Sequence, residues 1–585
     1  MLILFCVFVL SILFLMGYFK WSKNKKYLPK NYKYVKPIFI NPNKFKWNKM
    51  RFSMKKIPTD LDVIIIGSGM GGLTTAGLLS RTGKKVLVLE QHTIAGGSTH
   101  TYEDFGYEFD TGIHYIGNIK KREKILNLIT KNKIKWQQLG KEQNYVYDNL
   151  IIDDDKYPIR AGYENLINDL SKWFPKEKGA ITKYMELCKT VSKIDLHFMI
   201  KIIKPRCLAN IINYFHNKTF YEYSQISVKK MLDRYFTNPR LKAIIGGMSI
   251  DGGPPPKKQS FYIHASIVNH FAEGAYYPVG GCSIFANEIS KQLFERGSRV
   301  LVNAPVNNII ISNGKACGVR VKNKYNIYAK TIVSDIGIRN TYKKLIDQNL
   351  EESKYFDNVL NNISSNISYN FIFIGMKKNG EELGLKTNNI YMWPETSFDD
   401  SVDKYENDPF NENSKPPIFI ASNSMKDPIW KKRFPNKSVI SAISWSNTNM
   451  FNTNGIPRKR KDPKYTKNKE IVENVLLEAI FKHYPKVKNN IHCKSTSTSE
   501  SVKYYLGSYN GEVYGLDGTT KRFDYSKIRP KTNIENLYLT GQDIVMVGFS
   551  AVVISGVLTA SEILGYGTIP DIVTGRNIID DIGRL

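Results

Sequence analysis

The stretch Asp62–Glu90, DVIIIGSGMGGLTTAGLLSRTGKKVLVLE, constrains the fold more than any other part of this chain. Two unbroken apolar runs, Val63–Ile66 and Val86–Leu89, flank a glycine-rich loop and a helix-like pattern that ends at Gly83. Such runs predict parallel strands that are buried on both faces, and the stretch has the length of one βαβ unit. The sequence therefore predicts an α/β fold.

The loop within this unit predicts a phosphate-binding site. Gly67, Gly69 and Gly72 fit the dinucleotide fingerprint, whose glycines permit a tight turn, close approach of a pyrophosphate and close helix–strand packing. A helix that begins near Met70 would point its N-terminal N–H groups at that pyrophosphate. Glu90, at the end of the second strand, is placed to accept hydrogen bonds from an adenosine ribose. We therefore predict an ADP-containing dinucleotide bound by Glu90 and by the loop residues Gly67, Ser68, Gly69, Met70, Gly71 and Gly72.

Three further features favour FAD over NAD. A second glycine pair, Gly96–Gly97, suits another close backbone approach by an extended cofactor. Asp543 follows an apolar run and Gly541, where a carboxylate can bind ribityl hydroxyls that NAD lacks. A helix pattern of small residues comes next, and its N-terminus would stabilise negative charge on a reduced flavin. The chain has no second GxGxxG, so a separate NAD(P) site is not supported and the electron donor stays open.

Several longer stretches resemble one superfamily of flavoenzymes. They are VLEQHTIAGGSTHTYEDFGYEFDTGIHYIG, GAYYPVGGCSIFANEI, SMKDPIW, YYLGSYNGEVYGLDG and NLYLTGQDI. Across about residues 60–565 the chain is similar to the FAD-dependent amine oxidase/phytoene desaturase superfamily. EFDTGIHYIG and MKDPIW resemble the retinol saturases (all-trans-retinol 13,14-reductases) in particular, with the carotenoid isomerases as the next branch.

The resemblance implies roles for individual residues. Gly97 and Ser98 would pass beside the flavin end of the cofactor, and the backbone of Val306 would meet the adenine. Asp543 would bind the ribityl chain, with Ser550 and Ala551 near the isoalloxazine. The final helix carries bulky residues at 552–554, where family members differ, so the identity of the substrate is not carried over.

The predicted activity is reduction of a C=C bond in a retinol-like or other isoprenoid polyene by hydride transfer from flavin N5. A proton must reach the other carbon from a side chain or water, and His114 and Tyr514 are the candidates; each has a structural alternative. Two other functions remain open, namely a carotenoid desaturase or isomerase and a non-catalytic binder of prenyl groups like the GDP-dissociation inhibitors. Neither a metal site nor a disulfide framework is expected from six scattered cysteines.

The N-terminus predicts a membrane anchor. Residues 1–19 carry no charge and as a helix would span ~28 Å, about one hydrocarbon core. Lys20–Lys56 holds thirteen Lys or Arg and no acidic residue, which predicts a cytosolic catalytic domain and contact with anionic lipids. The resemblance implies the endoplasmic reticulum. The net charge of +31 is spread over the chain, and no nucleic-acid partner is expected.

These elements predict a Rossmann-type FAD-binding domain built from discontinuous segments, with an inserted α+β substrate domain. The FAD-binding domain would comprise residues 61–119, 291–345 and 530–585, after the anchor and a basic linker at 20–60. The substrate domain would comprise residues 120–290 and 346–529. Within it, the apolar segment 196–215 is either a buried helix or a helix lying on the membrane surface.

Overall fold

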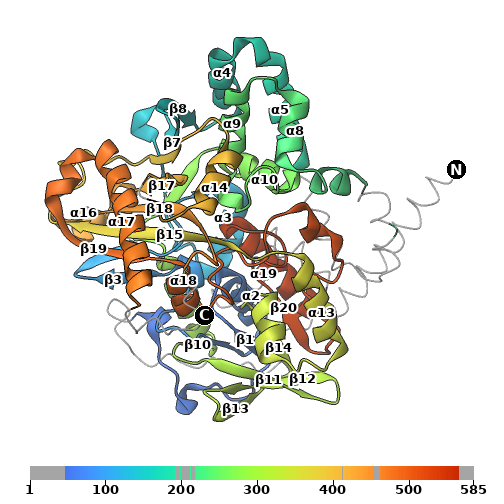
Figure 1. The fold of residues 1–585 in the computed structure, drawn as a ribbon. Coiled ribbons are helices and arrows are strands. Elements are labelled where there is room, and N and C mark those ends of the chain that lie inside the picture. Colours follow the sequence, from blue (N-terminus) through green and yellow to red (C-terminus); the bar gives the residue numbers. More distant parts are fainter. Residues whose placement is uncertain are drawn as a thin grey trace.

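The predicted βαβ unit is present and lies at the centre of a five-stranded parallel sheet (Figure 1). Strands β1 and β2 pair along their whole length, and all of their residues are buried, as expected for a sheet covered on both faces. In spatial order the strands are β10 (Arg299–Leu301), β2 (Val86–Leu89), β1 (Val63–Ile66), β14 (Thr331–Ser334) and β20 (Leu537–Leu539). Segments far apart in sequence therefore form one Rossmann-type sheet.

The computed structural model describes residues 46–192, 198, 211, 218–411, 413–451 and 462–565. The predicted anchor at 1–19, most of the linker at 20–60, nearly all of segment 196–215 and residues 566–585 lie outside these ranges. No helix within them is long and apolar enough to cross a bilayer.

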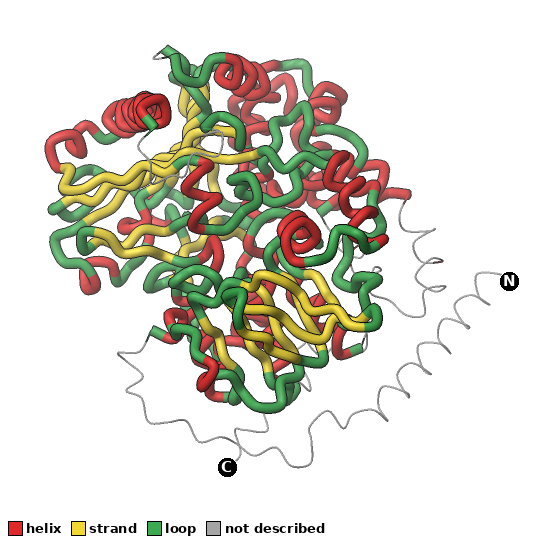
Figure 2. The backbone as a smooth tube through the Cα atoms, turned by 60° about the horizontal axis from the view of Figure 1, so that its bottom comes forward, coloured by secondary structure: helices red, strands yellow, loops and turns green. Residues whose placement is uncertain are grey.

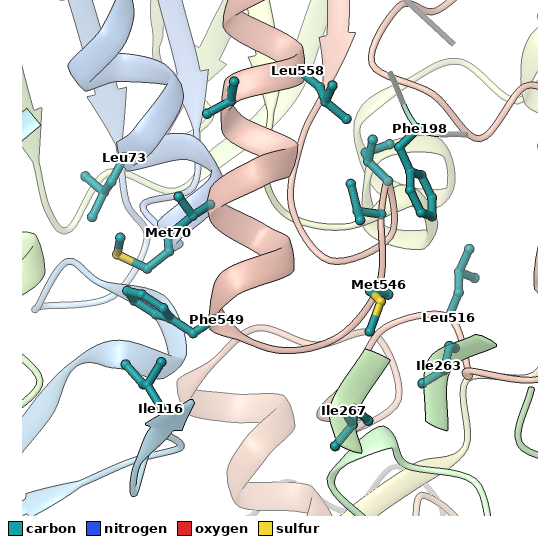
Figure 3. Packing of buried hydrophobic residues seen from close by; sticks show 14 of the residues in the cluster. Met70, Leu73, Ile116, Phe198, Ile263, Ile267, Leu516, Met546, Phe549 and Leu558 are labelled. Atoms are coloured by element: carbon teal, nitrogen blue, oxygen red, sulfur yellow. The ribbon is translucent and has the colours of Figure 1, made fainter. Parts of the chain in front are cut away.

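Helix α2 (Met70–Arg81) is buried along its entire length because three helices cover it. These are α3 (Ile119–Thr130), α11 (Ile284–Glu295) and α19 (Phe549–Leu564). Figure 3 shows Met70 and Leu73 of α2 beside α19, which begins at Phe549. The two helices approach closely at Gly556, where an added Cβ would lie 2.6 Å from Thr74 Cβ and 2.7 Å from the Gly71 carbonyl oxygen.

A three-stranded antiparallel sheet packs beside the parallel one and begins with a β-hairpin. Strands β11 (Val306–Ser312) and β12 (Lys315–Val321) are joined at Asn313 and Gly314, and β13 (Tyr325–Tyr328) follows. Asn313 and Gly314 both have positive φ, at 49° and 73°, as a type I′ turn requires.

The second large sheet has seven strands and forms the opposite side of the molecule (Figure 2). Two ten-residue antiparallel strands, β15 and β18, lie next to each other within it. In spatial order its strands are β19 (Ile491–Ser497), β15 (Ile367–Met376), β18 (Ser438–Asn447), β17 (Ile418–Ala421), β16 (Asn389–Trp393), β7 (Val146–Ile152) and β8 (Asp155–Arg160).

Residues 120–290 have a pattern of helix-like stretches that alternate with loops, but the structure also places strands β7 and β8 there. The β7 sequence VYDNLII places Asp148 and Asn149 inside a buried strand, which breaks the apolar pattern that would mark it. Both polar side chains are tolerated because they find hydrogen-bond partners on β16. Two small strands of this stretch, β6 (Trp136–Gln138) and β9 (Ala275–Pro278), also form a sheet with β5 (Ile116–Gly117). The domain boundaries themselves stay a prediction.

The helix crossing at Gly556 generates a stability prediction. Gly556→Ala should lower the free energy of unfolding by about 1–3 kcal/mol, because the new methyl overlaps the Gly71 backbone and a β-branched side chain. Gly179→Ala is the matched control, since Gly179 lies in α5 (Lys178–Val191) with nothing within 4 Å of an added Cβ. Its stability should be unchanged or raised by up to ~1 kcal/mol. Equal denaturant midpoints for the two variants would contradict the packing described here.

Candidate active site

One large cavity of about 1010 Å³ lies between the parallel sheet and the seven-stranded sheet. One end is lined by residues that follow the carboxyl ends of β1, β2 and β14, which is where open α/β sheets bind ligands. The other end is lined by aromatic side chains of the seven-stranded sheet and its neighbours. They include Tyr369, Phe371, Phe373, Tyr391, Phe419 and Trp445. The volume is at the top of the range of about 300–1,000 Å³ that is usual for small-molecule sites.

Glu90 fixes the conformation of the glycine-rich loop. Its Oε2 accepts hydrogen bonds from the Ser68 backbone N–H at 3.0 Å and from Ser68 Oγ at 2.6 Å. Its Oε1 accepts from the His92 backbone N–H at 2.8 Å. Ser68 Oγ in turn accepts from the Gly96 backbone N–H at 3.0 Å. A carboxylate, a loop and the second glycine pair are thus tied together at the edge of the cavity.

The glycine segments predicted from distant parts of the chain meet at the start of α2. A Cβ added at Gly97 would lie 3.1 Å from Gly69 Cα, and one at Gly71 would lie 2.7 Å from the Gly541 backbone nitrogen. Gly69 is the N-cap residue of α2 and supplies no side-chain cap of its own. An ADP-containing dinucleotide such as FAD fits this arrangement. Its pyrophosphate can approach backbone that carries no side chain, next to a helix N-terminus and near Glu90.

Asp543 is buried beside this junction. Its Oδ1 accepts from the Leu516 backbone N–H at 2.9 Å, and its Oδ2 accepts from the Ile338 backbone N–H at 2.7 Å. The carboxylate therefore joins three chain segments. It also lines the cavity, where its remaining acceptor capacity suits a hydroxyl-bearing ligand. Binding of the ribityl chain by Asp543 stays a prediction.

The other predicted contacts gather around the same cavity. All of the predicted cofactor-binding residues line it except Gly71 and Gly72, which lie behind the loop. The lining members are Gly67, Ser68, Gly69, Met70, Glu90, Gly96, Gly97, Ser98, Val306, Gly541, Asp543, Ser550 and Ala551. Their roles toward FAD stay predictions, but the structure brings them to one place.

Asp335, which follows β14 directly, was missed by the sequence analysis. Its carboxyl oxygens lie 2.7 Å from a Cβ added at Gly69, Gly71 or Gly541. Burial, together with repulsion from Glu90 and Asp543, raises the pKa of Asp335 to about 8, although hydrogen bonds from N–H groups of the loop oppose the shift. Its position at the carboxyl end of a parallel strand was the available signal.

The two candidate proton donors both line the cavity. Burial, followed by the nearby Lys426 charge, lowers the pKa of His114 to about 3, so its imidazole is neutral. His114 Nδ1 lies 3.2 Å from Asn423 Nδ2, and Nε2 has no hydrogen-bond partner among the described residues. Burial raises the pKa of the Tyr514 hydroxyl. A neutral imidazole donates hydrogen bonds but is a poor source of protons, which argues against His114 as the general acid.

A polar cluster on the cavity wall was also not predicted from the sequence. Tyr115, Tyr391 and Asp251 line the cavity, and Asp148 of β7 lies directly behind them. Tyr115 belongs to the motif GIHYIG, but its neighbours come from β7, β16 and the turn at Ile250–Gly252. Only the tertiary fold brings these side chains together, so no local spacing could have revealed them.

Comparison with known proteins now decides the family. The family model for flavin containing amine oxidoreductases matches residues 70–564. The chain belongs to this family. It is an FAD-dependent oxidoreductase of the retinol saturase and carotenoid isomerase type, as its relatives indicate.

Three relatives illustrate the range. An all-trans-retinol 13,14-reductase of Danio rerio is 35% identical, with 91% of this chain and 90% of the relative covered. An inactive all-trans-retinol 13,14-reductase of Danio rerio is 28% identical, with coverages of 88% and 87%. A chloroplastic prolycopene isomerase of Daucus carota is 26% identical, with coverages of 86% and 80%.

Solved structures agree with the fold. An oxidoreductase from Methanosarcina mazei superposes with a TM-score of 0.57 at 15% identity, and the match covers 86% of this chain and all of that one. At this identity the likeness shows the fold alone.

The role of Glu90 can be tested through cofactor retention. Glu90→Gln should weaken FAD binding ten- to hundredfold, because the amide replaces one acceptor with an NH2 donor that must face either the Ser68 or the His92 N–H group. The FAD-to-protein ratio after gel filtration and titration of the apoprotein measure this. Glu186→Gln, on the exposed face of α5, is the control and should retain FAD fully. Full retention by Glu90→Gln would exclude Glu90 from the site.

The raised pKa of Asp335 should make the free energy of unfolding depend on pH. Its pKa rises from 3.8 to about 8 on folding, so the folded state keeps a proton that the unfolded state loses. Stability from this group is therefore complete below pH 4 and is lost as the pH rises to 8. Asp335→Asn removes the effect. The melting temperature of the variant relative to that of the wild type should therefore increase as the pH rises from 5 to 9.

The exposed Asp60→Asn serves as control for this experiment, since it makes the same charge change away from the cavity. A melting-temperature difference between Asp335→Asn and the wild type that is independent of pH would show that Asp335 is already ionised in the folded state.

Proposed function

We propose that this enzyme reduces a C=C bond of a retinol-like or other isoprenoid polyene. The relationship to all-trans-retinol 13,14-reductases over about nine-tenths of the chain carries this proposal. The aromatic lining of the cavity supports it. Tyr115 stacks on Phe271 with ring centroids 4.6 Å apart, and Tyr391 packs on Phe419 at 4.6 Å. Flat apolar walls of this kind suit a rigid conjugated chain and exclude water from it.

The residues at the other end of the cavity would hold the cofactor. The loop at Gly67–Gly72 and the N-terminus of α2 would bind the pyrophosphate, Glu90 the ribose and Asp543 the ribityl chain. Bound FAD, once reduced, supplies a hydride to one carbon of the double bond. The chain's own residues orient the polyene against the start of α19, keep water out and supply the proton to the second carbon.

A second candidate is the isomerisation or desaturation of a carotenoid. The prolycopene isomerase among the relatives favours it, at lower identity than the retinol reductases. Family membership favours either enzyme over a non-catalytic binder of prenyl groups. The electron donor, NAD(P) included, stays open.

We also propose that the enzyme is associated with a membrane, with its catalytic domain on the cytosolic side of the endoplasmic reticulum. The uncharged segment at residues 1–19 and the basic stretch that follows support this location. A polyene substrate dissolved in the bilayer would fit the same arrangement.

A single-turnover experiment tests the activity. The FAD-loaded protein is photoreduced without oxygen and mixed with all-trans-retinol, and the products are analysed by mass spectrometry. We expect flavin reoxidation together with a product two mass units heavier than retinol. Flavin reoxidation without that product would reject retinol reduction. Conversion of prolycopene without net reduction, in a parallel reaction, would favour the isomerase.

A further inference from the structure

The polar cluster on the cavity wall is built around the hydroxyl of Tyr115. Tyr115 Oη lies 3.1 Å from Asp148 Oδ2, 3.3 Å from Asp251 Oδ2 and 2.8 Å from Tyr391 Oη. Tyr391 Oη also lies 2.8 Å from Asp251 Oδ1. Asp251 and the two tyrosines face the cavity, whereas Asp148 lies behind them on β7. Two carboxyl groups therefore share one hydroxyl in an otherwise aromatic wall.

Counting protons shows that the cluster stores at least one. The four contacts need four hydrogen atoms, and the hydroxyls of Tyr115 and Tyr391 provide only two. If both carboxyls were ionised, two contacts would be oxygen–oxygen contacts without a hydrogen atom, next to two buried negative charges. A proton on Asp148 or Asp251 supplies a third hydrogen atom and removes one of the two buried charges, as in other sites where two carboxyls share a proton.

The surroundings of the cluster favour the protonated form. Burial raises the pKa of Asp251, opposed by the hydroxyls of Tyr391 and Tyr115. Burial and the Asp251 charge together raise the pKa of Asp148 to about 7, although the hydrogen bonds from Asn389 and Tyr115 and the Lys426 charge oppose the shift. The ionisable groups that act on the two carboxyls from the surrounding elements are Tyr115, Tyr369, Tyr391, Tyr514 and Lys426.

Lys426 does not neutralise the pair directly. Its Nζ donates to the His114 carbonyl oxygen at 2.9 Å and to Asn389 Oδ1 at 2.5 Å. Asn389 Nδ2 then donates to Asp148 Oδ1 at 2.7 Å. Burial lowers the pKa of Lys426 to about 7, so its own charge is easily lost. The lysine of the MKDPIW motif thus orients Asp148 through an amide, and no salt bridge reaches either carboxyl among the described residues.

We propose that Asp251 is the general acid that protonates the polyene. The proposal rests on the proposed reduction of a C=C bond and names the group that completes it. Asp251 is the carboxyl of the pair that reaches the cavity, whereas Asp148, Tyr115 and Tyr391 position it. The cavity wall also continues toward the cofactor end, because the chain just before Tyr115 packs against Ser98. A Cβ added at Gly112, three residues before Tyr115, would lie 3.0 Å from Ser98.

Reduction of one C=C bond takes up one hydride and one proton. FAD held at the other end of the cavity would, when reduced, supply one hydrogen and two electrons as a hydride for the first carbon. The O–H bond of Asp251 breaks, a C–H bond forms at the second carbon, and Asp251 is left as a carboxylate. That carboxylate accepts hydrogen bonds from the hydroxyls of Tyr115 and Tyr391. It regains a proton from Asp148 through Tyr115 or from solvent before the next turnover.

Asp251→Asn tests this proposal in the single-turnover reaction with photoreduced enzyme and all-trans-retinol. The amide keeps the shape of the side chain but has no acidic proton, so product formation should slow at least about 100-fold. Retinol affinity, measured by fluorescence quenching, should change less than threefold. The wild-type rate should fall as the pH rises through the pKa of Asp251, and the variant rate should not depend on pH.

Tyr391→Phe gives an independent readout that does not require the Asp251 variant to fold. Its hydroxyl lowers the pKa of Asp251, so its removal should move the fall in rate to higher pH. Asp399→Asn is the control: Asp399 on α14 (Phe398–Asn407) is another carboxyl whose pKa is raised by burial, away from the cavity. Its rate and pH profile should match the wild type.

Two outcomes would overturn the proposal. One is an Asp251→Asn rate within threefold of the wild type with the same pH profile. The other is weaker retinol binding with an unchanged rate at saturation, which would make the cluster a binding site for the substrate's hydroxyl. Absence of the dihydro product from the wild-type enzyme is a different result, since it rejects the proposed function itself.

Discussion

The close approach of three backbone segments at the start of α2 is the constraint on which the rest of the structure depends. Gly71 meets Gly541 at a distance that leaves no room for a side chain, and Gly97 lies tightly against Gly69. This contact holds the C-terminal part of the chain against the first βαβ unit, and it sets where α19 must begin. The cavity exists because these segments converge here while the seven-stranded sheet stands apart from them.

Much of this end of the molecule could be predicted from sequence because its signals are local. A glycine loop between an apolar run and a helix pattern, or an Asn-Gly pair between strands, encodes its conformation within a few residues. Gly67, Glu90 and Gly541 were found in this way. The structure could assemble them because strand ends in a parallel sheet share one edge.

The residues that were missed depend on contacts between distant segments. Asp148 sits in a strand whose polar residues hide its pattern, and Asp251 lies in a short turn without periodicity. Their meaning comes from Tyr115 and Tyr391, which are separated from them by up to a few hundred residues. Asp335 could be predicted in part. Its position after an apolar run can be recognised in the sequence, but its approach to the glycine loop cannot.

The buried polar pair on β7 has a consequence for how this sequence can change. Asp148 and Asn149 occupy positions where valine or isoleucine would pack with a better strand propensity and no desolvation cost. A version of this chain optimised for thermal robustness alone would replace them first. Under the positioning role proposed for Asp148, stability and activity compete at this position, so stabilising substitutions should be sought on other residues of β7.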